Sequence, residues 1–90
     1  MRFTVTVLCG GKALMVTSKD VLDLDMEKSE KVLAEMGMIK SRFSEMLVMQ
    51  WQGMEVTVYP PGKVMFVPLS NKKEAVEYAT DIIERIVSDD

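Results

Sequence analysis

The stretch that decides the fold is residues 41–67, SRFSEMLVMQWQGMEVTVYPPGKVMFV. Two clusters of turn-forming residues, Gln52-Gly53 and Pro60-Pro61-Gly62, interrupt its apolar runs. Short runs rich in apolar and β-branched side chains between such turns are typical of strands. The stretch is therefore predicted to form three consecutive antiparallel strands, at 44–51, 54–59 and 63–67.

Alternation along these strands assigns their side chains to two faces of a sheet. One face is predicted to be the core, and it holds Met46, Val48, Met54, Val56, Val58, Val64 and Phe66. The opposite face is apolar and aromatic, interrupted by acids, and it holds Glu45, Leu47, Met49, Trp51, Glu55, Thr57, Tyr59 and Met65. Since aromatic residues and methionine are enriched at interface centres, we predict that this second face binds a partner.

The N-terminal residues indicate a further pair of strands. Phe3, Val5 and Val7 alternate with polar residues over 2–9, which is the period of a half-buried strand. The turn-forming residues 9–12 precede a second strand over 13–17, so 2–17 is predicted to be a hairpin.

Two helices complete the chain. Asp25 is predicted to cap a helix over 26–36, which Gly37 ends in a left-handed conformation. Ser70 or Asn71 is predicted to cap a second helix over about 72–87, with Glu74 in capping-box spacing from Asn71. One stripe of the first helix holds Met26, Ser29, Val32, Leu33 and Met36, and the apolar stripe of the second holds Ala75, Ala79, Ile82, Ile83 and Ile86.

These elements predict the fold class. The order is strand, strand, helix, three strands, helix, in one domain over residues 1–90. We expect an α+β fold, with a curved antiparallel sheet of about five strands and both helices on one face. The other face would be open.

Composition excludes several classes of site. The chain has 90 residues, of which 48% are hydrophobic and 28% are charged, the balance of a globular domain. With one cysteine and no histidine, a structural zinc site within one chain is excluded, and no cofactor is expected. The N-terminus lacks the pattern of a signal peptide, so the expected location is the cytoplasm.

Acidic residues give the chain candidates for catalysis. Glu45 and Glu55 could meet across neighbouring strands, and Asp20, Asp23 and Asp25 form a cluster before the first helix. No nucleophile–base pair accompanies them, and the cluster lacks the glycine and terminal glutamate of a calcium loop. The acids before the helix are better explained as approach and capping residues, and the chain is expected not to be an enzyme.

Four motifs follow one another along the chain: LDLDMEKSEKVL at 22–33, Arg42-Phe43, the hairpin Tyr59-Pro60-Pro61-Gly62-Lys63, and the capped last helix. In this order they resemble one repeat of the TATA-box-binding protein family, over roughly residues 13–87. The resemblance implies a TATA-binding-protein-like repeat fold. Phe43 and Tyr59 match the family's paired phenylalanines, which wedge into the DNA minor groove, and Lys63 matches its hairpin lysine. The resemblance therefore adds Phe43 and Lys63 to the candidate residues of the binding face.

The chain departs from this family at several positions. It has one repeat where the family has two, Met49 in place of a strand arginine, and Pro68 in place of a glycine. Glu45 and Glu55 stand at concave positions that are small or apolar in the family. Carboxylates repel phosphate, so the resemblance implies the scaffold while these charges point away from DNA.

Three functions remain open from the sequence. The first is a non-enzymatic binding module whose open sheet face binds a protein, most simply a second copy in a homodimer, unless the N-terminal hairpin covers that face. The alternative is nucleic-acid binding, with Trp51 and Tyr59 stacking on bases, although the net charge of −3 disfavours it. The third, an enzyme, has the least support.

Overall fold

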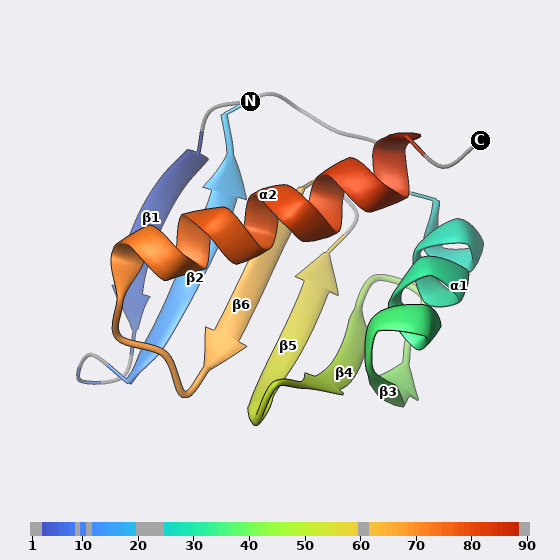
Figure 1. The fold of residues 1–90 in the computed structure, drawn as a ribbon, viewed down its shortest axis with the longest axis horizontal. Coiled ribbons are helices and arrows are strands. Elements are labelled where there is room, and N and C mark those ends of the chain that lie inside the picture. The colour runs from blue at the N-terminus through green and yellow to red at the C-terminus, as the bar shows by residue number, and fades with distance from the viewer. Residues whose placement is uncertain (1–2, 9, 11, 20–24, 60–61, 89–90) are drawn as a thin grey trace.

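The computed structural model describes residues 3–8, 10, 12–19, 25–59 and 62–88, which form one six-stranded antiparallel sheet and two helices (Figure 1). The elements are β1 (Phe3–Leu8), β2 (Ala13–Ser18), α1 (Met26–Met36), β3 (Met38–Arg42), β4 (Leu47–Trp51), β5 (Met54–Tyr59), β6 (Lys63–Val67) and α2 (Lys72–Ser88). The strand order across the sheet is β1-β2-β6-β5-β4-β3. The predicted α+β class is confirmed, with six strands in place of about five.

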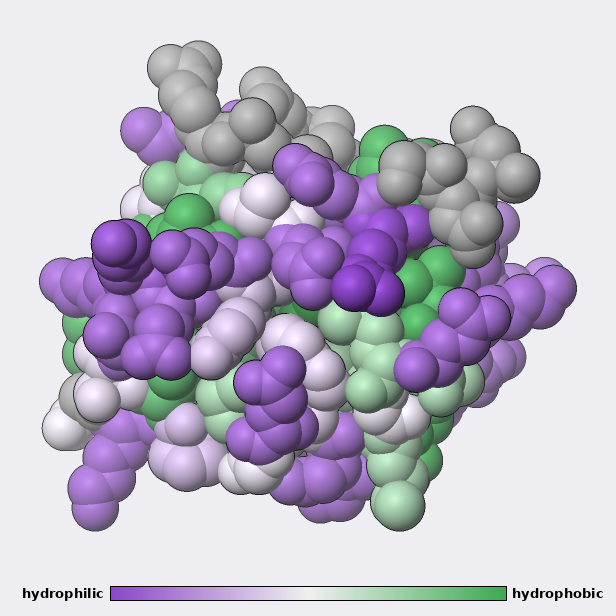
Figure 2. Space-filling model, viewed as in Figure 1, coloured by the Kyte–Doolittle hydropathy of each residue, from purple (hydrophilic) through white to green (hydrophobic). Residues whose placement is uncertain are grey.

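Both helices lie on the same side of the sheet. α2 runs across the strands, and α1 lies near β3 and β4 (Figure 1). The apolar stripe predicted for α2 is at most 2% exposed at each of its positions, Ala75, Ala79, Ile82, Ile83 and Ile86. Val32 and Leu33 bring α1 into the same core. Hydrophilic side chains gather over the solvent side of α2 (Figure 2), as expected for an amphipathic helix.

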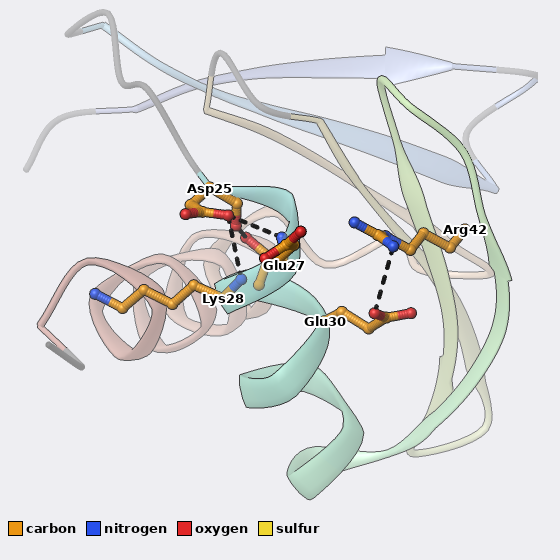
Figure 3. Close-up of polar contacts among 6 residues, drawn as sticks. Asp25, Glu27, Lys28, Glu30 and Arg42 are labelled. Atoms are coloured by element: carbon orange, nitrogen blue, oxygen red, sulfur yellow. Dashed lines mark hydrogen bonds and ion pairs between the residues drawn. The ribbon is translucent and has the colours of Figure 1, made fainter.

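Both predicted helix caps are formed. The Asp25 carboxylate accepts from the backbone N–H groups of Glu27 at 2.9 Å and Lys28 at 3.3 Å (Figure 3). The Asn71 side-chain oxygen accepts from the Glu74 N–H at 3.0 Å, so Asn71 and not Ser70 is the cap. Each cap satisfies N–H groups that the first helical turn cannot pair internally.

The predicted assignment of β4 to the two faces is wrong. Leu47 and Met49 are fully buried on the helix side, whereas Val48 is half-buried on the other side. The register explains this, because Leu47 pairs with Val58 and Met49 with Val56, both core residues. Paired residues share a face, so the alternation of the whole strand is shifted by one residue.

The turn that sets this register was visible in the sequence. Gln52 and Gly53 both have positive φ, at 50° and 78°, and make a two-residue hairpin turn. The residues on either side of such a turn face each other, so Trp51 and Met54 must lie on one side of the sheet. Met54 was correctly predicted to be core, and that fact places Trp51 on the core side too.

Strand β3 was not predicted. It begins directly after α1 and pairs with β4, while the residues expected to open the next strand, 44–46, form the connecting turn. Gly37 is extended (φ −155°) and not left-handed as predicted. A Cβ at this position would lie 2.5 Å from the Gln50 carbonyl oxygen, so glycine is needed for close approach to β4.

The N-terminal hairpin enlarges the sheet at one side. β2 pairs with β6 and β1 pairs with β2, both antiparallel. The predicted hairpin is thus confirmed, and because it lies within the sheet it does not cover the face opposite the helices. Within the described part of the chain, neither helix is long and apolar enough to cross a membrane.

Candidate functional site

The candidate site is the face of the sheet opposite the two helices, here called the outer face. The register assigns side chains to it, since Leu14, Val16, Val64 and Phe66 pair on the core side and the residues between them point the other way. By their pairing, the residues of the outer face include Thr4, Thr6, Leu8, Ala13, Met15, Thr17, Met38, Lys40, Ser41, Val48, Gln50, Glu55, Thr57, Tyr59, Lys63, Met65 and Val67.

The centre of the outer face is apolar and closely packed. Thr57 is 2% exposed although no helix covers it, because its cross-strand partners Val48 and Met65 lie on either side. Met15 pairs with Met65 and continues the row towards β1. Val48, Met65 and Met15 are all half-buried. Unbranched methionine side chains can adapt to another surface, so this centre suits contact with an apolar partner.

Charged groups lie around this centre. Lys40 Nζ is 3.3 Å from Glu55 Oε2, and both side chains remain nearly half exposed, at 46% and 47%. Such an exposed pair contributes at most about 1 kcal/mol, but it neutralises both charges on the outer face. At the other end of β5 from Glu55, Tyr59 pairs with Lys63 of β6, and Lys63 is exposed.

Five of the residues predicted for the binding face lie on the outer face: Glu55, Thr57, Tyr59, Lys63 and Met65. Three others belong to the core side. Leu47 and Met49 are 0% exposed, and the Trp51 ring meets Tyr78 of α2 edge-on, with centroids 5.2 Å apart and an interplanar angle of 80°. These three are excluded as contact residues of the outer face, and Trp51 cannot stack on a base there.

Phe43 and Glu45 occupy the turn between β3 and β4 and not a sheet face. The Phe43 N–H donates to the Met46 carbonyl at 2.8 Å, and the Phe43 side chain is 54% exposed. This turn and Tyr59 lie at the same end of the sheet, since Leu47 pairs with Val58. Phe43 and Tyr59, the two residues that match the family's paired phenylalanines, therefore lie at the same end of the sheet. Phe43 is in the β3–β4 turn and Tyr59 is the last residue of β5.

The predicted carboxylate pair is not formed. Glu55 opposes Gln50 near one end of β4, whereas Glu45 lies beyond the other end of that strand. Asp20 and Asp23 lie outside the described residues, and Asp25 is a helix cap. Among the described residues, no group of three His, Cys, Asp or Glu side chains is placed to hold a metal ion.

A separate depression of about 310 Å³ lies at the start of α2. Its lining residues are Lys12, Pro68, Leu69, Ser70, Asn71 and Glu74. The Glu74 carboxylate accepts a 2.9 Å hydrogen bond from the Tyr78 hydroxyl, and this bond raises the pKa of Tyr78 above its ordinary value. Asn71 is the helix cap, so the side chains of Asn71 and Glu74 are both occupied in hydrogen bonds within the helix and its cap.

Sequence reasoning missed part of the outer face. Val48 was assigned to the core, and Met15, Lys40 and Gln50 were not considered. Strand pairing is the signal that would have found Val48, because a two-residue turn fixes which residues of β4 and β5 share a face. Lys40 needed knowledge of β3, which the sequence did not reveal.

Comparison with protein-family models, with curated proteins and with solved structures found no protein that matches this chain. The outer face is therefore the feature from which a function can be inferred.

Proposed function

We propose that the chain is a non-enzymatic protein-interaction module, and that its outer face packs against the outer face of a second copy in a homodimer. The observation that carries the proposal is the apolar centre of this uncovered face, around Thr57, Met65 and Met15. Apolar surface of this kind gains free energy when a partner removes it from water.

The size of the face suits such a dimer. The molecule measures 35 × 27 × 20 Å, and Figure 1, which looks down the shortest axis, faces the sheet. The two longer dimensions bound the projected face at roughly 900 Å², and a standard interface buries about 800 Å² on each partner. A face-to-face pair therefore has room for an interface of standard size.

The charges of the face are self-complementary. Glu55 lies on one side of the central row that Thr57 and Met65 form, and Lys63 lies on the other side. A two-fold axis along this row places the Lys63 end of one chain over the Glu55 end of its partner. Lys63 then faces the partner's Glu55, and because the exposed Lys40–Glu55 pair is weak, that carboxylate can exchange Lys40 for Lys63 or bind both.

A nucleic-acid partner, the alternative function, has weaker support. Lys40 is already paired with Glu55, which leaves Lys63 as the other cation among the described outer-face residues. A protein that binds nucleic acid through phosphates needs several such cations. With Trp51 on the core side, the aromatic platform that single-stranded binding requires is also reduced.

Catalysis has weaker support as well. A catalytic carboxylate is ordinarily tuned by burial or by a specific partner. Glu55 is nearly half exposed, and Glu45 is exposed in a turn.

The proposal retains the likeness to one repeat of the TATA-box-binding protein family. Two helices on one side of an antiparallel sheet support it, as do Phe43 and Tyr59 at one end of that sheet. A dimer would then supply two repeats from two chains.

Sedimentation velocity over a range of protein concentrations tests the proposal. Met65→Lys should raise the dissociation constant of the outer-face pair at least tenfold, because it places a charge at the apolar centre, whereas Met65→Leu should change it little. Lys63→Glu should weaken the pair more than Lys63→Gln, because it opposes the partner's Glu55 with a like charge. A concentration dependence identical in Met65→Lys and the unsubstituted chain would refute outer-face pairing.

The nucleic-acid alternative has its own readout. Single- and double-stranded DNA oligonucleotides of about 20 nucleotides are titrated at low ionic strength, where charge-driven binding is strongest. Binding that Lys63→Gln weakens and Glu55→Gln strengthens would favour nucleic acid over a second copy as the partner of the outer face.

A further inference from the structure

The two edges of the sheet differ in a way that bears on assembly. β1 and β3 are the outermost strands, so each has one side without a strand partner among the described residues (Figure 1). Unpaired backbone N–H and C=O groups along such an edge can hydrogen-bond to another strand. Folded proteins ordinarily block this pairing with charges, bulges or proline.

The β3 edge carries these protections. Its sequence is MIKSR, and both Lys40 and Arg42 are exposed. Lys40 is held by Glu55 at 3.3 Å, and Arg42 Nη1 lies 3.7 Å from Glu30 Oε1 of α1 (Figure 3). The pairing with β4 also shifts between Ile39 and Ser41, which breaks the regular ladder. A further strand could not pair regularly along β3 without disturbing these charges.

The β1 edge carries none of these protections over its described length. Its sequence is FTVTVL, without a charge or a proline. It pairs with β2 at six consecutive positions without a register shift, so its free edge is regular. None of its side chains is buried, and Val7 is 47% exposed although it lies on the helix side of the sheet. α2 crosses the face of the sheet at β1 (Figure 1).

We propose that β1 pairs antiparallel with β1 of a second copy, about a two-fold axis perpendicular to the sheet. This operation joins two six-stranded sheets into one continuous sheet with all the helices on one side. The helix sides of the two β1 strands then adjoin, so Phe3, Val5 and Val7 contact the same set in the partner strand. On the outer side, Thr4, Thr6 and Leu8 likewise contact their counterparts. The edge is therefore complementary to itself in both side chains and backbone.

The two edges favour a closed dimer through β1 over an open-ended polymer in which β1 of one copy pairs with β3 of the next. Pairing of β1 with a β3 edge would leave another β1 free and propagate into a fibre, and the charges and bulge of β3 oppose it. Pairing of β1 with β1 uses both free edges at once and leaves the two protected β3 edges outermost. The assembly therefore closes at two chains.

The β1 edge is a different surface from the outer face through which the proposed dimer forms. The outer face lies perpendicular to the β1 edge, so both contacts can exist together and would then join four chains. Either contact alone gives a dimer. Because a six-residue edge buries less area than a standard interface, we expect its dimer to depend on concentration.

Sedimentation velocity on four chains separates the two contacts: the unsubstituted protein, Val7→Lys, Met65→Lys and the double variant. Val7→Lys places on β1 the kind of charge that protects β3, and it should raise the dissociation constant of the edge pair at least tenfold. Val7→Thr, which is uncharged and β-branched, should change it by less than threefold. Met65→Lys should leave the edge pair intact, and the double variant should be a monomer.

Each outcome assigns one surface. Self-association that Val7→Lys leaves unchanged overturns the edge pair, whatever Met65→Lys does. Self-association that responds to Val7→Lys alone supports the edge pair and refutes the outer-face dimer. A monomer at all concentrations overturns both.

Amide hydrogen exchange of the unsubstituted protein gives a test that needs no variant to fold, because alternate β1 amides should become protected as concentration rises. Concentration-independent exchange throughout β1 would overturn the edge pair.

Discussion

The placement of β4 predicts opposite responses at two neighbouring residues. Met49 is fully buried and pairs with Val56 in the core, whereas Val48 is half-buried and pairs with Thr57 on the outer face. We compare Met49→Ala with Val48→Ala. Both substitutions shorten an apolar side chain in the same strand, so a difference between them reports the face on which each residue lies.

The expected magnitudes follow from burial. Met49→Ala removes three heavy atoms beyond Cβ from a fully enclosed site, which costs about 2.5 kcal/mol in transfer free energy at roughly 0.8 kcal/mol per group. The cavity left behind brings the total to about 3–4 kcal/mol. Val48→Ala removes two methyl groups from a site that is already partly hydrated, and it should cost about 1 kcal/mol. A domain of 90 residues has roughly 5–13 kcal/mol of stability, so both variants should fold.

Urea unfolding measures the difference. The chain has one tryptophan, and the edge-on contact of Trp51 with Tyr78 makes its fluorescence sensitive to loss of the core. With an m value of about 1.5 kcal/mol/M, Met49→Ala should lower the midpoint by about 2 M and Val48→Ala by less than 1 M. A larger loss for Val48→Ala than for Met49→Ala would refute the register of β4 and restore the reversed assignment of its faces.

Three further predictions concern the helices and their contacts. Gly37→Ala should destabilise by about 1–3 kcal/mol in urea unfolding, because its Cβ would meet the Gln50 carbonyl oxygen; an unchanged midpoint would contradict this close approach. Asn71→Ala should cost about 1 kcal/mol in the same assay through loss of the cap to Glu74, and Asn71→Asp should cost less. The hydrogen bond to Glu74 raises the pKa of Tyr78 in the folded state. The stability that this bond contributes is therefore complete below a pH of about 10, the pKa in the unfolded chain, and it is lost as the pH rises through the higher folded-state pKa. Glu74→Gln should therefore lower that pKa, as measured by the ultraviolet absorbance of tyrosinate, and an unchanged titration would show that the bond is not responsible.

Both helices could be predicted from the sequence because each carries several signals that agree. In α2, a capping residue at Asn71 precedes an apolar stripe that includes Ala79 and Ile83, and a helix over these residues is the structure that the pattern favours. In α1, Asp25 supplies the cap and Leu33 the buried face. Cap and periodicity are local properties, so they need no knowledge of the rest of the fold.

The face of β4 could not be read from its own residues. Residues 46–49 are all apolar, and alternation has no meaning where no polar residue marks the solvent side. The missing information lay in the partner strand, where Glu55 marks the outer face and Val56 the core. β3 was missed for the opposite reason, because its sequence MIKSR is mostly polar and exposed, and its identity as a strand depends on pairing with β4.

The edge strands show most clearly what topology adds to sequence. A charge-free FTVTVL would be ordinary in the middle of a sheet, where neighbours on both sides satisfy its backbone. It becomes a binding edge only because the strand order places β1 outermost. The same order places Lys40 and Arg42 on the opposite edge, where their charges exclude another strand. Since pairing through β1 would also set two outer faces side by side in one continuous sheet, an edge dimer would double the apolar surface around Met65 that a further pair of chains could cover.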